Sequence, residues 1–171
     1  MNETFKFQLD GTTVVNTDLI LEAKEIKQLP VGLIEIKGNL NVSGNPSFKL
    51  NGYPKRVGGY FDCSYNDLSS LQGMPEEVDG DIYLESNKIS FLDGLPNEVI
   101  GDLYLSYNQL KNLDGISKEI FGSLSLTDNN QLTSLEALKG VKIGQDLSLR
   151  DIPATEVPAG IQIRGNIVIR S

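Results

Sequence analysis

Apolar and polar residues alternate in short segments that return at a nearly constant interval along the chain. Each segment places two apolar residues on either side of one outward residue, and its first apolar position recurs at spacings of 21, 21, 21, 21, 21, 23 and 20. This alternation is typical of a short strand whose two apolar side chains point inward. The first positions of the eight predicted strands are Leu19, Leu40, Phe61, Ile82, Leu103, Leu124, Leu147 and Ile167. The second positions are Leu21, Val42, Cys63, Leu84, Leu105, Leu126, Leu149 and Ile169.

A glycine column and an asparagine column accompany the strands. Glycine at the start of the segment removes a side chain where the backbone bends into the strand. The asparagine amide both donates and accepts, so stacked asparagines are expected to satisfy backbone groups at the turn in a ladder through successive coils. Lys24 and Ile152 replace this asparagine in the first and seventh coils, and extra residues near Asn130 and Ala137 are expected to loosen the sixth coil. The glycines are Gly38, Gly59, Gly80, Gly101, Gly122 and Gly165, and the asparagines are Asn45, Asn66, Asn87, Asn108 and Asn129.

The motif L-x-L-x-x-N-x-L, as in LYLSYNQL at residues 103–110, resembles the leucine-rich repeat. The short period and the LPVGL segment resemble the bacterial and bacteriophage type of this repeat, whose convex side is nearly free of helix. The resemblance covers roughly residues 18–171. It implies a solenoid fold, whereas the proteins of this family bind many unrelated partners.

The repeat predicts a mainly β leucine-rich-repeat solenoid with a parallel concave sheet of about eight short strands and irregular convex turns. Residues 1–17 are predicted to form an N-terminal β-hairpin cap turning at Asp10–Gly11, and residues 18–171 the solenoid, within one domain overall. No C-terminal cap is expected after Ile169. The apolar edge of the last coil is therefore a candidate surface for a homodimer.

The net charge and the residue composition exclude or disfavour several classes of function. The 171 residues carry a formal net charge of −8, which disfavours nucleic acid and favours a basic partner. The chain has no histidine, so catalytic triads, histidine metal sites and histidine switches are excluded. No apolar stretch is long enough for a membrane helix, and the N-terminus lacks the pattern of a signal peptide. The single cysteine, Cys63, excludes an internal disulfide and favours a cytoplasmic location.

The outward positions of the predicted sheet carry tyrosines among carboxylates. Tyrosine supplies a large contact area with little loss of conformational entropy, and carboxylates steer and select a basic partner. Tyrosine is also a common strand residue, and aspartate keeps an exposed sheet soluble, which is the purely structural interpretation. The predicted protein-binding residues are Tyr60, Asp62, Asp81, Tyr83, Glu85, Asp102, Tyr104, Tyr107, Arg150 and Arg170.

No catalytic, cofactor-binding or metal-binding residues are predicted, and the protein is not expected to be an enzyme. Asp81 and Asp102 stand one repeat apart, a spacing that also suits a calcium site or a pair of catalytic carboxylates, although two solvated acids explain it more simply.

The predicted function is a non-enzymatic protein-binding module. The resemblance to phage and bacterial arrays implies an inhibitor of a host or defence protein. The alternatives are self-assembly through the C-terminal coil and an acidic mimic of nucleic acid.

Overall fold

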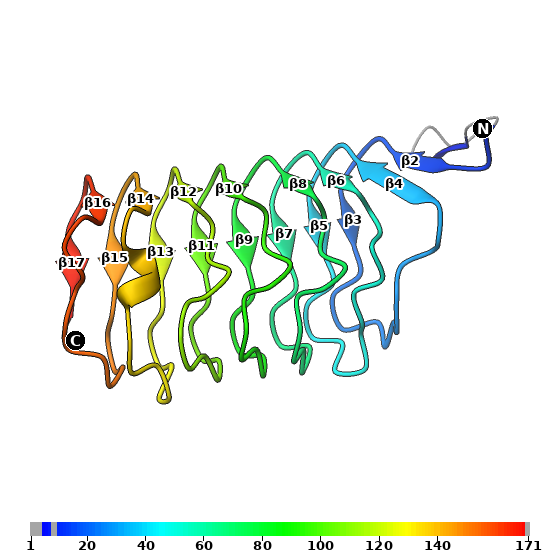
Figure 1. The fold of residues 1–171 in the computed structure, drawn as a ribbon. Helices are drawn as coiled ribbons and strands as arrows, with labels where there is room; N and C mark the ends of the chain where they lie inside the picture. The colour runs from blue at the N-terminus through cyan, green and yellow to red at the C-terminus, as the bar shows by residue number, and fades with distance from the viewer. Residues whose placement is uncertain (1–4, 8–9, 170–171) are drawn as a thin grey trace.

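Eight two-residue strands pair side by side, in chain order and all parallel, along one side of the protein (Figure 1). The computed structural model describes residues 5–7 and 10–169. We call these eight strands the main sheet, and they coincide with the eight strands predicted from the apolar alternation. They are β3 (Leu19–Ile20), β5 (Leu40–Asn41), β7 (Phe61–Asp62), β9 (Ile82–Tyr83), β11 (Leu103–Tyr104), β13 (Leu124–Ser125), β15 (Leu147–Ser148) and β17 (Ile167–Val168). The predicted mainly β repeat solenoid is thereby confirmed.

A second row of strands precedes the main sheet in each coil. It forms one sheet in the order β1-β2-β4-β6-β8 and another in the order β10-β12-β14-β16, with parallel pairing except between β1 and β2. The sequence analysis expected turns without regular structure outside the main sheet, so this row is an addition to the predicted fold. Its strands are β1 (Phe5–Phe7), β2 (Thr13–Val15), β4 (Leu33–Ile36), β6 (Arg56–Val57), β8 (Glu77–Val78), β10 (Glu98–Val99), β12 (Glu119–Ile120), β14 (Lys142–Ile143) and β16 (Gln162–Ile163).

The core is a column of apolar side chains that runs through the stacked coils. Leu84 and Leu105 are fully buried, whereas Tyr83 and Tyr104 between the inward positions are only half-buried, so the predicted inward and outward alternation holds. Cys63 is also fully buried, as its inward position predicts. No coil encloses these side chains alone, and the stacking of neighbouring coils removes them from water.

The predicted asparagine ladder is present. All five asparagines of the column are buried, with at most 7% of their surface exposed. Asn66 shows the pattern: its Nδ2 atom donates to the backbone oxygens of Val42 and Cys63, while its Oδ1 atom accepts the backbone N–H of Asn45 at 2.6 Å. Each amide therefore binds its own turn and the preceding coil, which fixes the spacing of the coils on this side.

The sixth coil absorbs its two additional residues without disturbing the main sheet. Leu124 pairs in register with Leu147, although 23 residues separate them. A short 3₁₀-helix, η1 (Glu136–Leu138), takes up the extra length and buries Leu138 against the core (Figure 1). The predicted loosening is thus a local helical turn, which leaves the strand register unchanged.

The two ends of the solenoid differ. The predicted hairpin is present as the antiparallel pair β1–β2, and β2 continues into the second row through β4. The assignment of residues 1–17 as a cap stays a prediction, since Leu9 and residues 1–4 lie outside the described residues. At the other end, β17 is an edge strand, and Ile167 and Ile169 are 41% and 58% exposed. Within the described residues no helix has the length and apolar character of a membrane span.

Candidate functional site

Three tyrosine rings form a row on the outer face of the main sheet. The rings of Tyr83 and Tyr104 stack with centroids 4.9 Å apart and planes 4° apart. Tyr60 meets Tyr83 edge-to-face, with centroids 5.9 Å apart. Because β9 and β11 pair in register, the two stacked rings come from equivalent positions in neighbouring coils. We call Tyr60, Tyr83 and Tyr104 the tyrosine row.

The tyrosine hydroxyls are held by the carboxylates that precede them. Tyr83 donates to Oδ2 of Asp81 at 3.1 Å, and Tyr104 donates to Oδ2 of Asp102 at 2.9 Å. In each pair the aspartate directly precedes the strand and the tyrosine ends it, two residues on, so both side chains project from the same face. These hydrogen bonds fix the orientation of the rings before any partner binds.

The same carboxylates also bind the backbone of the next coil. Oδ1 of Asp81 accepts the N–H of Asp102 at 2.8 Å, and Oδ1 of Asp102 accepts the N–H of Ser123 at 2.7 Å. Asp18, Asn39 and Asp146 occupy equivalent positions and make the equivalent bond to Asn39, Tyr60 and Asn166. The sequence analysis placed this column at the binding surface as solvated acids. In the structure it is a second ladder, which we call the carboxylate ladder, and both oxygens of Asp81 and Asp102 are engaged.

The carboxylate ladder explains the glycine column. A Cβ atom on Gly101 would overlap Oδ1 of Asp81, and one on Gly122 would overlap Oδ1 of Asp102. Glycine therefore clears the space in which the carboxylate of the preceding coil reaches the backbone. Thr17 in the first coil and Gln145 in the seventh stand where the other coils have glycine, and the coil before Gln145 carries Ser123 in place of a ladder carboxylate.

The surroundings raise the pKa values of Tyr83, Tyr104 and the neighbouring Glu85. Burial, followed by the hydrogen bond to Asp81 and the charges of nearby carboxylates, raises the pKa of Tyr83 to about 12. The same causes, with Asp102 as the hydrogen-bond partner, raise the pKa of Tyr104. Burial and the charge of Asp62 raise the pKa of Glu85. The row is thus a neutral aromatic surface within a negative field at ordinary pH.

Asp62 and Glu85 lie at the border of the tyrosine row. Asp62 is the register partner of Tyr83, and its Oδ1 atom accepts the N–H of Ser64 at 3.0 Å. Glu85 follows β9 on the same face and is half-buried. Neither takes part in the carboxylate ladder, so these two carboxylates are better placed than Asp81 and Asp102 to meet a partner.

Two further tyrosines stand at the rim, where each main-sheet strand turns away. Tyr65 and Tyr107 are 64% and 57% exposed, and both have φ of 57°, in the left-handed region. The residues at this turn position in other coils include Gly44, Ser86 and Asp128. A bulky residue with positive φ is unusual, and such strain is concentrated at functional sites. Tyr107 was predicted for the site, whereas Tyr65 was left out. Gly44 at the equivalent position was the sequence signal for a turn with positive φ.

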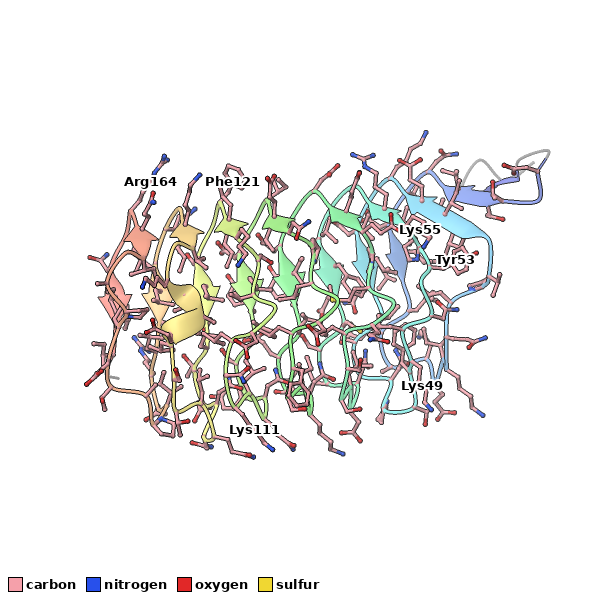
Figure 2. All side chains as sticks on the ribbon, in the orientation of Figure 1. Lys49, Tyr53, Lys55, Lys111, Phe121 and Arg164 are labelled. Carbon is pink, nitrogen blue, oxygen red and sulfur yellow. The ribbon has the colours of Figure 1, made fainter. Side chains whose placement is uncertain are left out.

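The predicted arginines do not join the tyrosine row. Arg150 is exposed beyond β15, two coils from Tyr104. Arg170 lies outside the described residues. Figure 2 shows Arg164 and Phe121 pointing away from the coils at the edge formed by the second row of strands.

In the part of the chain that the structure describes, Asp81 and Asp102 do not form a metal site, and Cys63 is not a reactive thiol. Among the described residues, no three acidic, cysteine or histidine side chains gather as a group for a metal ion. Asp81 and Asp102 instead use their oxygens for the backbone and the tyrosines. Burial raises the pKa of the Cys63 thiol to about 12, which keeps it protonated and unreactive.

Comparisons with protein-family models, curated proteins and solved structures give no match to this chain.

Proposed function

We propose that the protein is a non-enzymatic binding module that captures another protein on the outer face of its main sheet. The tyrosine row forms the centre of the contact, Asp62 and Glu85 provide negative charge beside it, and Tyr65 and Tyr107 extend it at the rim. The partner presents a basic surface, because the net charge of the chain is −8 and the row lies among carboxylates. As part of the same proposal, the chain is a leucine-rich-repeat protein of bacterial or phage type that works in the cytoplasm as an inhibitor.

The observation that carries this proposal is the fixed stack of Tyr83 and Tyr104. Their rings pack on each other, and their hydroxyls are bound to Asp81 and Asp102. Ordering a side chain on binding costs about 0.5–1.5 kcal/mol, and preorganised rings avoid much of that loss. Large aromatic side chains with one polar end are also enriched among the residues that dominate protein interfaces.

Capture from bacterial and phage-infected lysates on the immobilised protein tests the proposal. The double variant Tyr83→Ser/Tyr104→Ser is expected to lose the captured protein. The matched control is Val31→Ser/Phe91→Ser, which removes two exposed apolar side chains outside the main sheet and is expected to capture normally. Thermal unfolding of both variants shows that the fold is retained. Undiminished capture by the tyrosine variant contradicts the proposal.

Self-assembly through the last coil is a second candidate, favoured by the exposure of Ile167 and Ile169 on the edge strand β17. An exposed apolar edge pairs readily with another chain. Light scattering over a wide range of protein concentration distinguishes the two candidates. A constant monomer mass excludes assembly. A mass that rises with concentration and falls in Ile167→Lys supports it.

A further inference from the structure

Tyr104 ends the stack of rings, and the next coils offer only small side chains beside it. The register partner of Tyr104 is Ser125, and the partner of Ser125 is Ser148. Ser123 lies two residues before Ser125, at the carboxylate-ladder position of its coil. We call Ser123, Ser125 and Ser148 the serine patch. Since a serine side chain has one heavy atom beyond Cβ, it does not cover the ring of Tyr104 as Tyr104 covers Tyr83.

Two hydroxyls of the serine patch, those of Ser125 and Ser148, are paired within the sheet. Oγ of Ser125 lies 2.8 Å from Oγ of Ser106, and Oγ of Ser148 lies 3.0 Å from Oγ1 of Thr127. These pairs keep the hydroxyls close to the strands, so the ring face of Tyr104 on this side is open to a planar group. A group placed there would extend the stack by one more layer.

Carboxylates stand on both sides of the serine patch. Asp102 and Asp146 occupy the carboxylate-ladder position in the coils before and after Ser123, about 9–10 Å apart at two strand spacings. Asp146 is exposed and uses only Oδ1 for its hydrogen bonds, to the backbone and side-chain nitrogens of Asn166. Arg150 lies two residues beyond Ser148, past the end of β15, so the patch has the carboxylate of Asp146 on one side of Ser148 and a guanidinium on the other.

We infer that the serine patch receives an arginine side chain of the partner, which stacks on the open face of Tyr104 and pairs with Oδ2 of Asp146. This inference rests on the proposed function and names the chemistry of the group recognised. A guanidinium is planar, permanently charged and able to stack on an aromatic ring while its N–H groups bind carboxylates. A lysine ammonium lacks the plane, and an aromatic ring of the partner lacks the charge.

The protein itself contains a related contact at another place. The Nζ atom of Lys55 lies 5.7 Å from the ring centroid of Tyr53, and both side chains are labelled in Figure 2. That lysine also forms an exposed ion pair with Glu76 at 3.0 Å. A cation over a tyrosine with a carboxylate beside it is therefore an arrangement that occurs elsewhere in this protein.

Titration with hexa-arginine and hexa-lysine peptides of equal charge tests the inference. The chain has no tryptophan, so binding is followed directly by tyrosine fluorescence and confirmed by calorimetry. We expect the arginine peptide to bind at least about tenfold more tightly at moderate salt, as a stacking contribution on top of charge predicts. Ser125→Tyr fills the patch with a ring of the protein itself, in the place proposed for the guanidinium. This variant is expected to remove the preference for arginine.

Two variants control for changes in charge and aromatic content. Ile20→Tyr adds a tyrosine at the equivalent position of the first coil and is expected to keep the preference. Asp146→Asn keeps the Oδ1 acceptor, as Asn39 does at the same ladder position, and is expected to weaken arginine binding by several fold. Equal affinity for both peptides, or unchanged arginine binding in Ser125→Tyr, overturns the inference. If the Tyr83/Tyr104 variant loses protein capture but the two peptides bind equally, the proposed function stands. Only the recognition of an arginine side chain at the serine patch is then refuted.

Discussion

Gly122 and Asp102 meet closely: the Oδ1 atom of Asp102 lies too near the position of a Cβ atom on Gly122 for both atoms to fit. From there the carboxylate accepts the N–H of Ser123, while its other oxygen orients Tyr104. Gly122 thus supports both the stacking of the backbone and the placement of a surface ring.

Replacing this glycine should damage the fold and the tyrosine row together. Gly122→Ala is expected to lower the free energy of unfolding by about 3 kcal/mol, because the added methyl group displaces the carboxylate and meets the backbone of Gly101. Gly140→Ala is the matched control: nothing lies within 4 Å of its added Cβ, and only its positive φ costs about 1 kcal/mol. Urea unfolding of both variants makes the comparison. Equal losses would contradict the overlap.

Two adjacent asparagines allow a direct test of the asparagine ladder. Asn129 is fully buried, donates to the oxygens of Leu105 and Leu126, and accepts the N–H of Leu110, whereas Asn130 is exposed. Asn129→Ala leaves these backbone groups without a partner, so we expect a loss of about 2–4 kcal/mol in the free energy of unfolding. Asn130→Ala is expected to change it by less than about 0.5 kcal/mol. Thermal or urea unfolding that ranks the two equally would refute the ladder's role.

The raised pKa of Tyr83 predicts a dependence on alkaline pH. Its folded pKa of about 12 exceeds the ordinary value of 10.0, so the folded protein holds this proton more tightly than the unfolded chain. The resulting contribution to stability is complete below pH 10 and is lost as pH rises through about 12. Ultraviolet absorbance of tyrosinate should show late ionisation that Tyr83→Phe diminishes. A titration of all six tyrosines at the ordinary value would be incompatible with the buried, hydrogen-bonded row.

The strained turn at Tyr65 predicts opposite effects on stability and binding. Asparagine tolerates positive φ better than other non-glycine residues, so Tyr65→Asn is expected to raise the free energy of unfolding by about 0.5–1 kcal/mol while weakening partner capture. Tyr65→Ala also removes the ring but keeps the strain, so it should weaken capture without the gain in stability. Normal capture by both variants would count against a binding role for this tyrosine, and an equal stability gain in Tyr65→Ala would count against strain at its turn.

The main sheet was predictable because alternation within each strand and constant spacing between strands both appear directly in the sequence. The second row was not, since a strand such as Arg56–Val57 buries one residue beside a charged one and shows no alternation. The tyrosine row was found from its outward position. The hydrogen bond of Asp81 to the backbone of the next coil was missed, because its partner, Asp102, lies 21 residues away. A carboxylate on the outer face of a predicted sheet is expected to be solvated.

Thr17 hinders the stacking of another coil in front of β3. A further coil placed before β3 in the common register, with an aspartate or asparagine at its ladder position, would bring its Oδ1 atom against the side chain of Thr17, where each coil that follows such a residue has glycine. We therefore expect that copies of this protein cannot join front to back into a continuous filament. Association of copies through β17 is then expected to bring two last coils together as closed pairs.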